Sequence, residues 1–245
     1  MLEVEGLSKR YDGLLAVSDL SFEVRPAEIL GLVGPNGAGK TTTMRCLAGI
    51  LPATAGKVRI CGHDLASDPV EAKRRLAFIP DEPRLFDYLT VSEHLKFIAR
   101  IYQVPEAEAR ASTLLAELEL TDKTKSLPGE LSRGMKQKLA IACGLLHDPA
   151  VILFDEPLTG LDPVGIRRMK DSIARRAGAG ASIIVSSHLL HLVEELCHRI
   201  LVIKGGTKVA HGTLAEIKAA APELQADASL EDVFLHVTSH GPSAK

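Results

Sequence analysis

Cysteine is scarce in this chain and has none of the spacings that bind metals or close disulfide frameworks. The 245 residues include four cysteines, and no two of them form a C-x-x-C pair. Zinc-binding and disulfide-rich chains depend on such spacings, so the pattern argues against both classes. It favours small apolar side chains in a reducing compartment. The four positions are Cys46, Cys61, Cys143 and Cys197.

Long hydrophobic runs and a strong excess of charge are also absent. No apolar run approaches the ~18 residues that a membrane-spanning helix needs. Hydrophobic residues still make up 46% of the chain, which is enough for a sizeable core, and the net charge of −2 gives no sign of a nucleic-acid partner. The acidic, strand-like start at Met1–Glu5 leads us to expect no signal peptide. If the protein serves a membrane, we expect it to act through a partner.

A glycine-rich segment, Gly34–Thr42 (GPNGAGKTT), is the strongest feature that is present. It follows the apolar run Ile29–Val33 and precedes a helix-like segment that includes Met44. In this strand–loop–helix context, G-x-x-x-x-G-K-[ST] predicts a polyphosphate site. Glycines let backbone N–H groups turn toward the anion, and the helix presents its free N–H groups to it. Lys40 supplies positive charge for the β- and γ-phosphates, and the Thr41 hydroxyl can ligate Mg²⁺.

Two further apolar runs end in polar side chains that suit phosphate chemistry. Val151–Phe154 is typical of a strand buried on both faces, and Asp155 and Glu156 follow it directly. Parallel sheets bind ligands at the carboxyl ends of their strands, so Asp155 is placed to hold Mg²⁺. A second buried strand is expected at 183–188, and it ends in the polar residue His188.

The first residues and the middle of the chain predict two separate regions. Residues 2–7 alternate between apolar and polar, as expected for an edge strand, followed by a turn over 8–13 and a strand over 21–25. Tyr11 lies in that turn, where it either covers a hydrophobic edge or stacks on an adenine ring. The period becomes helical over residues 90–120, which predicts a helical lobe inserted in the domain.

The order of these motifs is distinctive. The phosphate loop is followed by the helical insert, a Leu-Ser-x-Gly turn at 131–134, the strand ending in Asp155 and Glu156, a Leu-Asp turn at 161–162 and the strand ending in His188. In this order the chain resembles, over almost its full length, the nucleotide-binding subunit of ATP-binding cassette (ABC) transporters. The joint match is far more specific than the phosphate loop alone.

The resemblance implies a fold and a domain organisation. We expect an α/β fold: a P-loop NTPase core with a mostly parallel sheet, an N-terminal antiparallel β-subdomain and an inserted helical subdomain. The cassette would cover residues 1–220, with the helical subdomain at about 84–150, and residues 221–245 would form a short helix and a flexible tail. The segments L-S-R-G-M-K-Q at 131–137 and S-L-E-D-V-F-L at 229–235 are similar to those of multidrug or polysaccharide-type exporters.

The resemblance also implies roles for matching positions, with ATP and Mg²⁺ as ligands. Glu156 would polarise the attacking water, while His188 would contact the γ-phosphate and hold Glu156 in place. Lys40 would complete the catalytic set, and Thr41 and Asp155 would hold Mg²⁺. The implied ATP-binding set is Tyr11, Gly34, Pro35, Asn36, Gly37, Ala38, Gly39, Lys40, Thr41 and Thr42. Because such subunits dimerise head to tail, Ser132, Arg133, Gly134 and Asp162 would lie at the seam with a second cassette.

Two positions depart from the family pattern. Asp81 stands where the family has a glutamine that touches Mg²⁺ and the membrane partner, and Arg133 stands where the family usually has glycine. The Asp81 carboxylate can still ligate the metal, but it adds negative charge beside a triphosphate. We hypothesise that Arg133 lies near the opposite phosphate or the seam and favours a closed dimer. Ordinary subfamily variation without energetic effect is the alternative for both positions.

Other functional classes fit the sequence to different degrees. A GTPase needs an N-K-x-D motif, and Asn36 is the only asparagine. A small-molecule kinase would not need the Leu-Ser-x-Gly turn or the strand ending in His188. A soluble single-cassette ATPase that acts as a regulatory or assembly factor without transport stays open.

The transporter interpretation carries its own partners and location. It implies an integral membrane permease, a second cassette that is identical or different, and no nucleic acid. The protein would be cytoplasmic and peripheral on the inner face of the cell membrane. A permease helix that docks near residues 81–89 would separate this interpretation from the soluble one.

Replacing Asp81 with glutamine tests the first departure. ATP hydrolysis should persist, but its Mg²⁺ requirement should change, because the neutral amide removes a negative charge beside the triphosphate. A Mg²⁺ titration of the ATPase rate measures the difference. Superimposable titrations for the two proteins would contradict the hypothesis.

Overall fold

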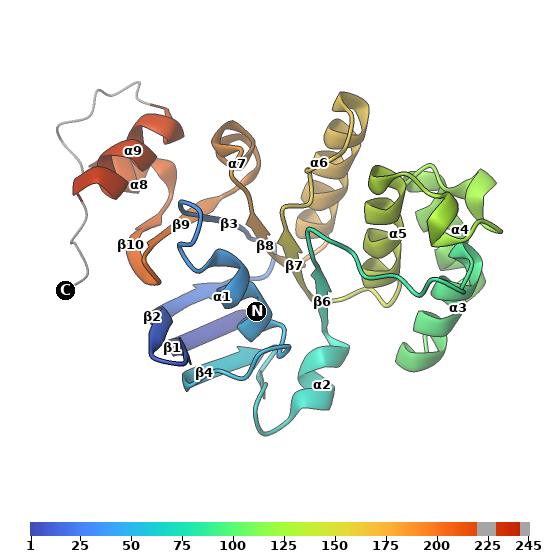
Figure 1. Cartoon of the computed structure of the whole chain (residues 1–245), viewed down its shortest axis with the longest axis horizontal. Coiled ribbons are helices and arrows are strands. Elements are labelled where there is room, and N and C mark those ends of the chain that lie inside the picture. The colour runs from blue at the N-terminus through green and yellow to red at the C-terminus, as the bar shows by residue number, and fades with distance from the viewer. Residues whose placement is uncertain (220–228, 241–245) are drawn as a thin grey trace.

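A six-stranded, mostly parallel sheet forms the centre of the molecule. The computed structural model describes residues 1–219 and 229–240. The strands of this sheet are β3 (Ile29–Val33), β6 (Leu76–Ile79), β7 (Val151–Asp155), β8 (Ser182–Ser186), β9 (Arg199–Lys204) and β10 (Thr207–Gly212). Their order is β10-β9-β3-β8-β7-β6, and only the β9–β10 pair is antiparallel (Figure 1). The carboxyl ends of β3, β7 and β8 therefore meet at one edge.

The N-terminal strands form the expected antiparallel sheet, with two corrections. It consists of β1 (Leu2–Tyr11), β2 (Leu14–Val24), β4 (Ala55–Ile60) and β5 (His63–Asp64), in the order β2-β1-β4-β5. The expectation that residues 2–7 form an edge strand is wrong, because β1 lies between β2 and β4. Alternation fixes which face of a strand is buried but not which strands flank it. The expected turn over 8–13 is reduced to Asp12 and Gly13, whose positive φ angles of 34° and 96° give a two-residue hairpin turn.

Helices cover both faces of the central sheet. Figure 1 shows α6 and α7 on one side, with α1 and the antiparallel sheet on the other. No helix within residues 1–219 and 229–240 is long and apolar enough to cross a membrane. The α-helices are α1 (Lys40–Leu47), α2 (Pro69–Arg74), α3 (Val91–Tyr102), α4 (Ala107–Glu117), α5 (Arg133–Leu145), α6 (Pro163–Gly178), α7 (Leu190–Leu196), α8 (Leu214–Ala219) and α9 (Leu230–His240). Two 3₁₀ turns, η1 (Thr121–Lys123) and η2 (Pro128–Glu130), lie between α4 and α5.

The side chains of the central strands alternate between two cores. Ile152 and Phe154 of β7 belong to a cluster that includes Ile173 of α6. Leu153, between them, belongs to the opposite cluster with Met44 of α1. All five residues of β7 are buried, as expected for a parallel strand covered on both faces.

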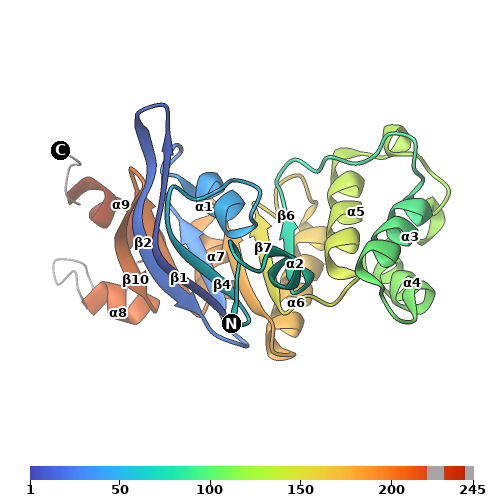
Figure 2. The same ribbon diagram turned by 90° about the horizontal axis from the view of Figure 1, so that it is seen from below.

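A lobe of α3, α4 and α5 stands beside β6 and away from the antiparallel sheet (Figures 1 and 2). A reciprocal cap fixes its first helix: the Thr90 hydroxyl accepts the Glu93 N–H, and the Glu93 carboxylate accepts the Thr90 N–H. Val91 and Leu95 of α3 are buried in the same apolar cluster as Phe154 of the central sheet. The lobe and the sheet therefore share one hydrophobic core.

The last described segment, α9, is the C-terminal helix that the sequence predicted. Its residues Leu230 and Val233 are buried in a cluster with Val33 of β3 and Val193 of α7. The Leu230 N–H also donates to a Glu194 carboxylate oxygen at 3.0 Å. These contacts attach α9 to the sheet. The expected tail after residue 240 lies outside the described residues.

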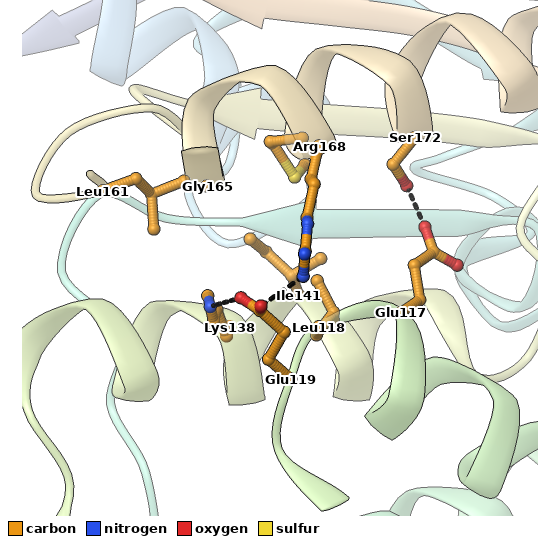
Figure 3. Close-up of a pocket in the computed structure, with 10 residues that line it drawn as sticks. Glu117, Leu118, Glu119, Lys138, Ile141, Leu161, Gly165, Arg168 and Ser172 are labelled. Carbon is orange, nitrogen blue, oxygen red and sulfur yellow. Dashed lines mark hydrogen bonds and ion pairs between the residues drawn. The ribbon is translucent and has the colours of Figure 1, made fainter. Parts of the chain in front are cut away.

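Charged side chains join the lobe to α6, as Figure 3 shows. Glu119, just after α4, forms ion pairs with Lys138 of α5 and Arg168 of α6, and Lys138 lowers the pKa of the Glu119 carboxyl. The Ser172 hydroxyl of α6 donates to a Glu117 carboxylate oxygen at 2.5 Å. These side chains border a cavity of about 20 Å³, which has room for about one water and no larger ligand. The contact between the lobe and α6 therefore has a structural role.

Glu117→Gln should lower the free energy of unfolding by about 1–3 kcal/mol. The Arg175 and Arg176 guanidinium groups lie 3.4 and 3.5 Å from the Glu117 carboxylate and would lose its charge, while Ser172 would keep an acceptor. Urea unfolding followed by circular dichroism measures the change. The control Asp171→Asn, at an exposed position of α6, should stay within about 0.5 kcal/mol. Equal losses in the two variants would remove the special role of Glu117.

Candidate functional site

The glycine-rich loop opens into solvent between β3 and α1. Gly37 and Gly39 have φ angles of 76° and 101°, a region that suits glycine. A Cβ on Gly34 would lie 2.3 Å from the Ile203 carbonyl oxygen, so this glycine lets the loop approach β9 closely. A Cβ on Gly37 would meet no described atom within 4 Å. The loop is thus tied to the sheet at its start and open at its tip.

Lys40, the first residue of α1, folds its side chain back over this loop. Its Nζ donates to the carbonyl oxygens of Gly34 at 2.7 Å and Pro35 at 3.3 Å. Partial burial lowers the pKa of the Lys40 ammonium, while the negative charges of Glu156 and Asp155 oppose that shift. The ammonium is therefore held between the loop and the two acids at the carboxyl end of β7, Asp155 and Glu156.

The two acids are fixed by the neighbouring strand. Asp155 and Ser186 are register partners in the β7–β8 pair. The Ser186 hydroxyl donates to Asp155 Oδ1 at 2.5 Å, and the Glu156 N–H donates to the Ser186 carbonyl oxygen at 3.1 Å. Asp155 is only 4% exposed. Sequence reasoning assigned no role to Ser186, although the parallel register of the two predicted strands would have placed it beside Asp155.

His188 closes this edge of the site. Its Nδ1 lies 2.8 Å from Glu156 Oε2, and its backbone N–H donates to the same oxygen at 3.4 Å. The His188 side chain is 59% exposed and the Glu156 side chain only 16%. Glu156 has a φ of 51°, a strained value for a residue with a side chain. Two contacts from His188 thus hold the carboxylate of Glu156, a residue whose backbone has a left-handed conformation.

A cleft of about 530 Å³ brings most of the predicted residues together. Tyr11 reaches it from the β1 hairpin, and Lys9 Nζ lies 5.0 Å from the centre of the Tyr11 ring. Asp81, just after β6, lines the cleft as well. Its other predicted lining residues are Asn36, Gly37, Ala38, Gly39, Lys40, Thr41, Thr42, Asp155, Glu156 and His188. Leu14, Ala16 and Thr159 also line it and were not predicted.

The residues predicted for the dimer seam do not line this cleft. Ser132 caps α5 by accepting the Met135 N–H, and Asp162 caps α6 by accepting the Gly165 N–H. Gly134 packs so closely that a Cβ there would lie 3.0 Å from the Gly160 carbonyl oxygen. Arg133 pairs with Asp81 at 3.6 Å. These four residues surround the start of α5 and the turn before α6.

The donors of the cleft fit a magnesium–nucleotide complex. Within the described part of the chain, no three His, Cys, Asp or Glu side chains are placed to hold a metal on their own. Mg²⁺ is normally bound by one or two carboxylates, a hydroxyl, phosphate oxygens and water, so Asp155, Asp81 and Thr41 are a suitable set. One Asp81 oxygen is buried and makes no hydrogen bond with any residue that the structure describes, which leaves it available to a cation. The open Gly37 tip and the α1 N-terminus suit the phosphates.

Comparison with known proteins places this arrangement in a family. The model of the ABC transporter family matches residues 17–159, more than half of the chain. The chain belongs to the ABC transporter family. A relative is the ABC-type transporter ATP-binding protein EcsA of Bacillus subtilis, 34% identical over 97% of this chain and 96% of its own length. Another is the Nod factor export ATP-binding protein I of Burkholderia pseudomallei, 40% identical over 86% of this chain and 70% of its own.

One solved structure supports the same family and a second, more distant one has the same fold. The ATP-binding subunit of an ABC transporter is 35% identical and superposes with a TM-score of 0.93, covering 97% of this chain and 99% of that one. A dimeric ATP-binding cassette in a post-hydrolysis state with ADP and Pi is 23% identical, with a TM-score of 0.80 over 87% of this chain and 99% of that one. The ABC protein described here is thus an ATP-binding ATPase with a P-loop α/β core.

Gly37→Ala should weaken ATP binding at least about tenfold, because the new methyl group enters the open tip of the phosphate loop. The control Gly62→Ala has a similar φ of 84° and also meets no described atom within 4 Å, but it lies outside the cleft. Both variants should lose about 1–2 kcal/mol of stability, the usual cost of a left-handed side-chain residue. Equilibrium binding of a fluorescent ATP analogue separates them, and equal affinities would contradict the prediction.

Proposed function

We propose that this cassette powers an exporter, working as a head-to-tail pair of ATPase subunits on a membrane permease. The observation that carries the proposal is the cluster of Lys40, Asp155, Glu156 and His188 at one end of the cleft. Ser132, Arg133 and Gly134, by contrast, do not line the cleft of their own subunit. The cleft thus has the residues needed to bind a nucleotide but is open on one side. A second cassette would close that side.

The residues of the cleft divide the work of phosphoryl transfer. Lys40 and the loop N–H groups hold the triphosphate, and Tyr11 offers a ring for the adenine. Asp155 and Thr41 would hold Mg²⁺, with Asp81 beside them. When bound, Mg²⁺ neutralises charge on the β- and γ-phosphates. Transfer needs little covalent help from the protein, so position and charge decide the rate.

Glu156 and His188 act on the attacking water. Glu156 orients the water and accepts a proton from it. The 2.8 Å contact from His188 Nδ1 keeps the Glu156 carboxylate turned into the cleft. The exposed His188 ring stays available to the γ-phosphate. Ser186 fixes both acids through the backbone and through Asp155, so we propose it as a positioning residue.

The second cassette would supply the missing side of the nucleotide. The N-terminus of α5, at Ser132 and Gly134, offers free N–H groups for an anion but does not line its own cleft. In a head-to-tail dimer it would meet the γ-phosphate on the opposite subunit, with Asp162 at the seam. The dimeric cassette with ADP and Pi supports this arrangement by likeness of fold. ATP then favours the closed pair and hydrolysis opens it.

Glu156→Gln should trap an ATP-bound dimer, because the amide keeps the shape of the side chain but cannot accept the proton. Light scattering after size exclusion, with ATP present, measures the dimer fraction, and phosphate release should fall at least about a hundredfold. Glu108→Gln, at an exposed position of α4, serves as the control. A Glu156→Gln protein that hydrolyses ATP at the wild-type rate would remove Glu156 from this role.

An exposed apolar surface next to the cleft fits a permease. A groove of about 260 Å³ runs between the loop after β6 and helices α3 and α5. Phe86 and Phe97 line it with their ring centres 5.2 Å apart, and Tyr88, two residues after Phe86 in the sequence, is 91% exposed. Only four residues separate Asp81 of the cleft from Phe86. We propose that an apolar helix of the permease docks here, which places the cassette on the inner face of the membrane.

The permease proposal is tested by capture from solubilised membranes of the host. Wild-type protein with ATP should retain a polytopic membrane protein, and Phe86→Ser with Phe97→Ser should lose it. Ile50→Ser, which removes another exposed apolar side chain far along the chain from the groove, should retain it. Capture by all three proteins would reject this docking surface. Capture by none would favour the soluble, non-transporting ATPase.

A further inference from the structure

The two residues that depart from the family pattern, Asp81 and Arg133, lie next to each other. Arg133 Nη2 is 3.6 Å from Asp81 Oδ1, although the two residues are far apart in the sequence. Asp81 follows β6 and lines the nucleotide cleft, whereas Arg133 begins α5 outside it. Each departure therefore supplies the charge that the other lacks.

Helix α5 holds the segment after β6 at two points. The buried Gln137 side chain donates from Nε2 to the Pro80 carbonyl oxygen at 3.1 Å. Arg133 is four residues earlier on the same face of the helix and reaches the next residue, Asp81. The Arg133 stem also passes Gly160, where a Cβ would lie 3.6 Å from it. Gln137 is a neutral, enclosed contact, and Arg133 is a charged contact open to solvent.

The ion pair between Asp81 and Arg133 is weak enough for a metal ion to replace Arg133. The Arg133 and Asp81 side chains are 65% and 40% exposed, and such ion pairs are weak. Asp81 Oδ1 itself is buried and has no hydrogen bond within the described residues, since 3.6 Å is too long for one. A divalent cation in the cleft would satisfy this oxygen better than a distant guanidinium. The Asp81 carboxylate can thus pair with Arg133 before nucleotide binds and with a divalent cation afterwards.

We propose that Arg133 is a positioning residue that acts through Asp81. Until nucleotide and Mg²⁺ bind, Arg133 would pair with Asp81 and be kept at its own cleft. When ATP and Mg²⁺ are bound, Asp81 turns to the metal and releases Arg133, which is then free to meet the nucleotide of the facing cassette. Loading of one site thereby prepares the surface that closes the other. This inference rests on the proposed function, because it requires Mg²⁺–ATP in the cleft.

Mg²⁺-dependent nucleotide binding tests the exchange without measuring turnover. A fluorescent ATP analogue is titrated with Mg²⁺ in wild type, Arg133→Gln, Asp81→Asn and the double variant. Arg133→Gln should lower the half-saturating Mg²⁺ concentration by about threefold, the range expected for an exposed ion pair. Asp81→Asn should raise that concentration, and the double variant should match Asp81→Asn alone. Arg133→Lys should behave like wild type.

A matched control removes charge without touching the pair. Lys136→Gln takes one positive charge from the same helix and should leave the half-saturating Mg²⁺ concentration unchanged. Arg133→Gln is therefore compared in two backgrounds, wild type and Asp81→Asn. If it shifts the half-saturating Mg²⁺ concentration equally in both, the effect is a general change of electrostatic potential that does not involve Asp81, and the proposal is overturned. A wild-type protein that binds no ATP analogue at any Mg²⁺ concentration would instead reject the proposed function itself.

Discussion

The register between β7 and β8 is the constraint on which the rest of the site depends. It sets Asp155 opposite Ser186 at the ends of two buried strands, so a single hydroxyl and a single carbonyl fix both acids. Because these strands are covered on both faces, they cannot slip without exposing one apolar cluster or the other. The hydrophobic core therefore fixes the position of the polar groups, and the glycine loop only has to reach them from β3.

The site concentrates opposed charges that are unfavourable elsewhere in a protein. Lys40 is partly desolvated, Asp155 is nearly buried, and Glu156 has a left-handed backbone. Each of these groups is tolerated because the others compensate: the acids oppose the shift in the Lys40 pKa, and His188 and Ser186 hold Glu156. Such a cluster favours a ligand that brings its own negative oxygens and a cation.

Local patterns predicted the sheet, the phosphate loop and the acids at the carboxyl end of β7, because each depends on neighbours in sequence. They failed where the answer depends on distant partners. Alternation in residues 2–7 marked a buried face but not the central position of β1. Ser186 was overlooked since its importance comes from strand register. The approach of Arg133 to Asp81 arises from packing of the lobe against β6, and no spacing in the sequence encodes it.

The shared core of the lobe and the sheet has a mechanical meaning. Buried apolar side chains interdigitate at close to crystalline density, so the lobe cannot move against the sheet without breaking contacts that both contribute. The lobe is therefore coupled to the sheet, and a displacement of one is transmitted to the other. The ion pairs of Glu119 and the Ser172–Glu117 hydrogen bond add directional contacts to this coupling, because they fix the lobe relative to α6.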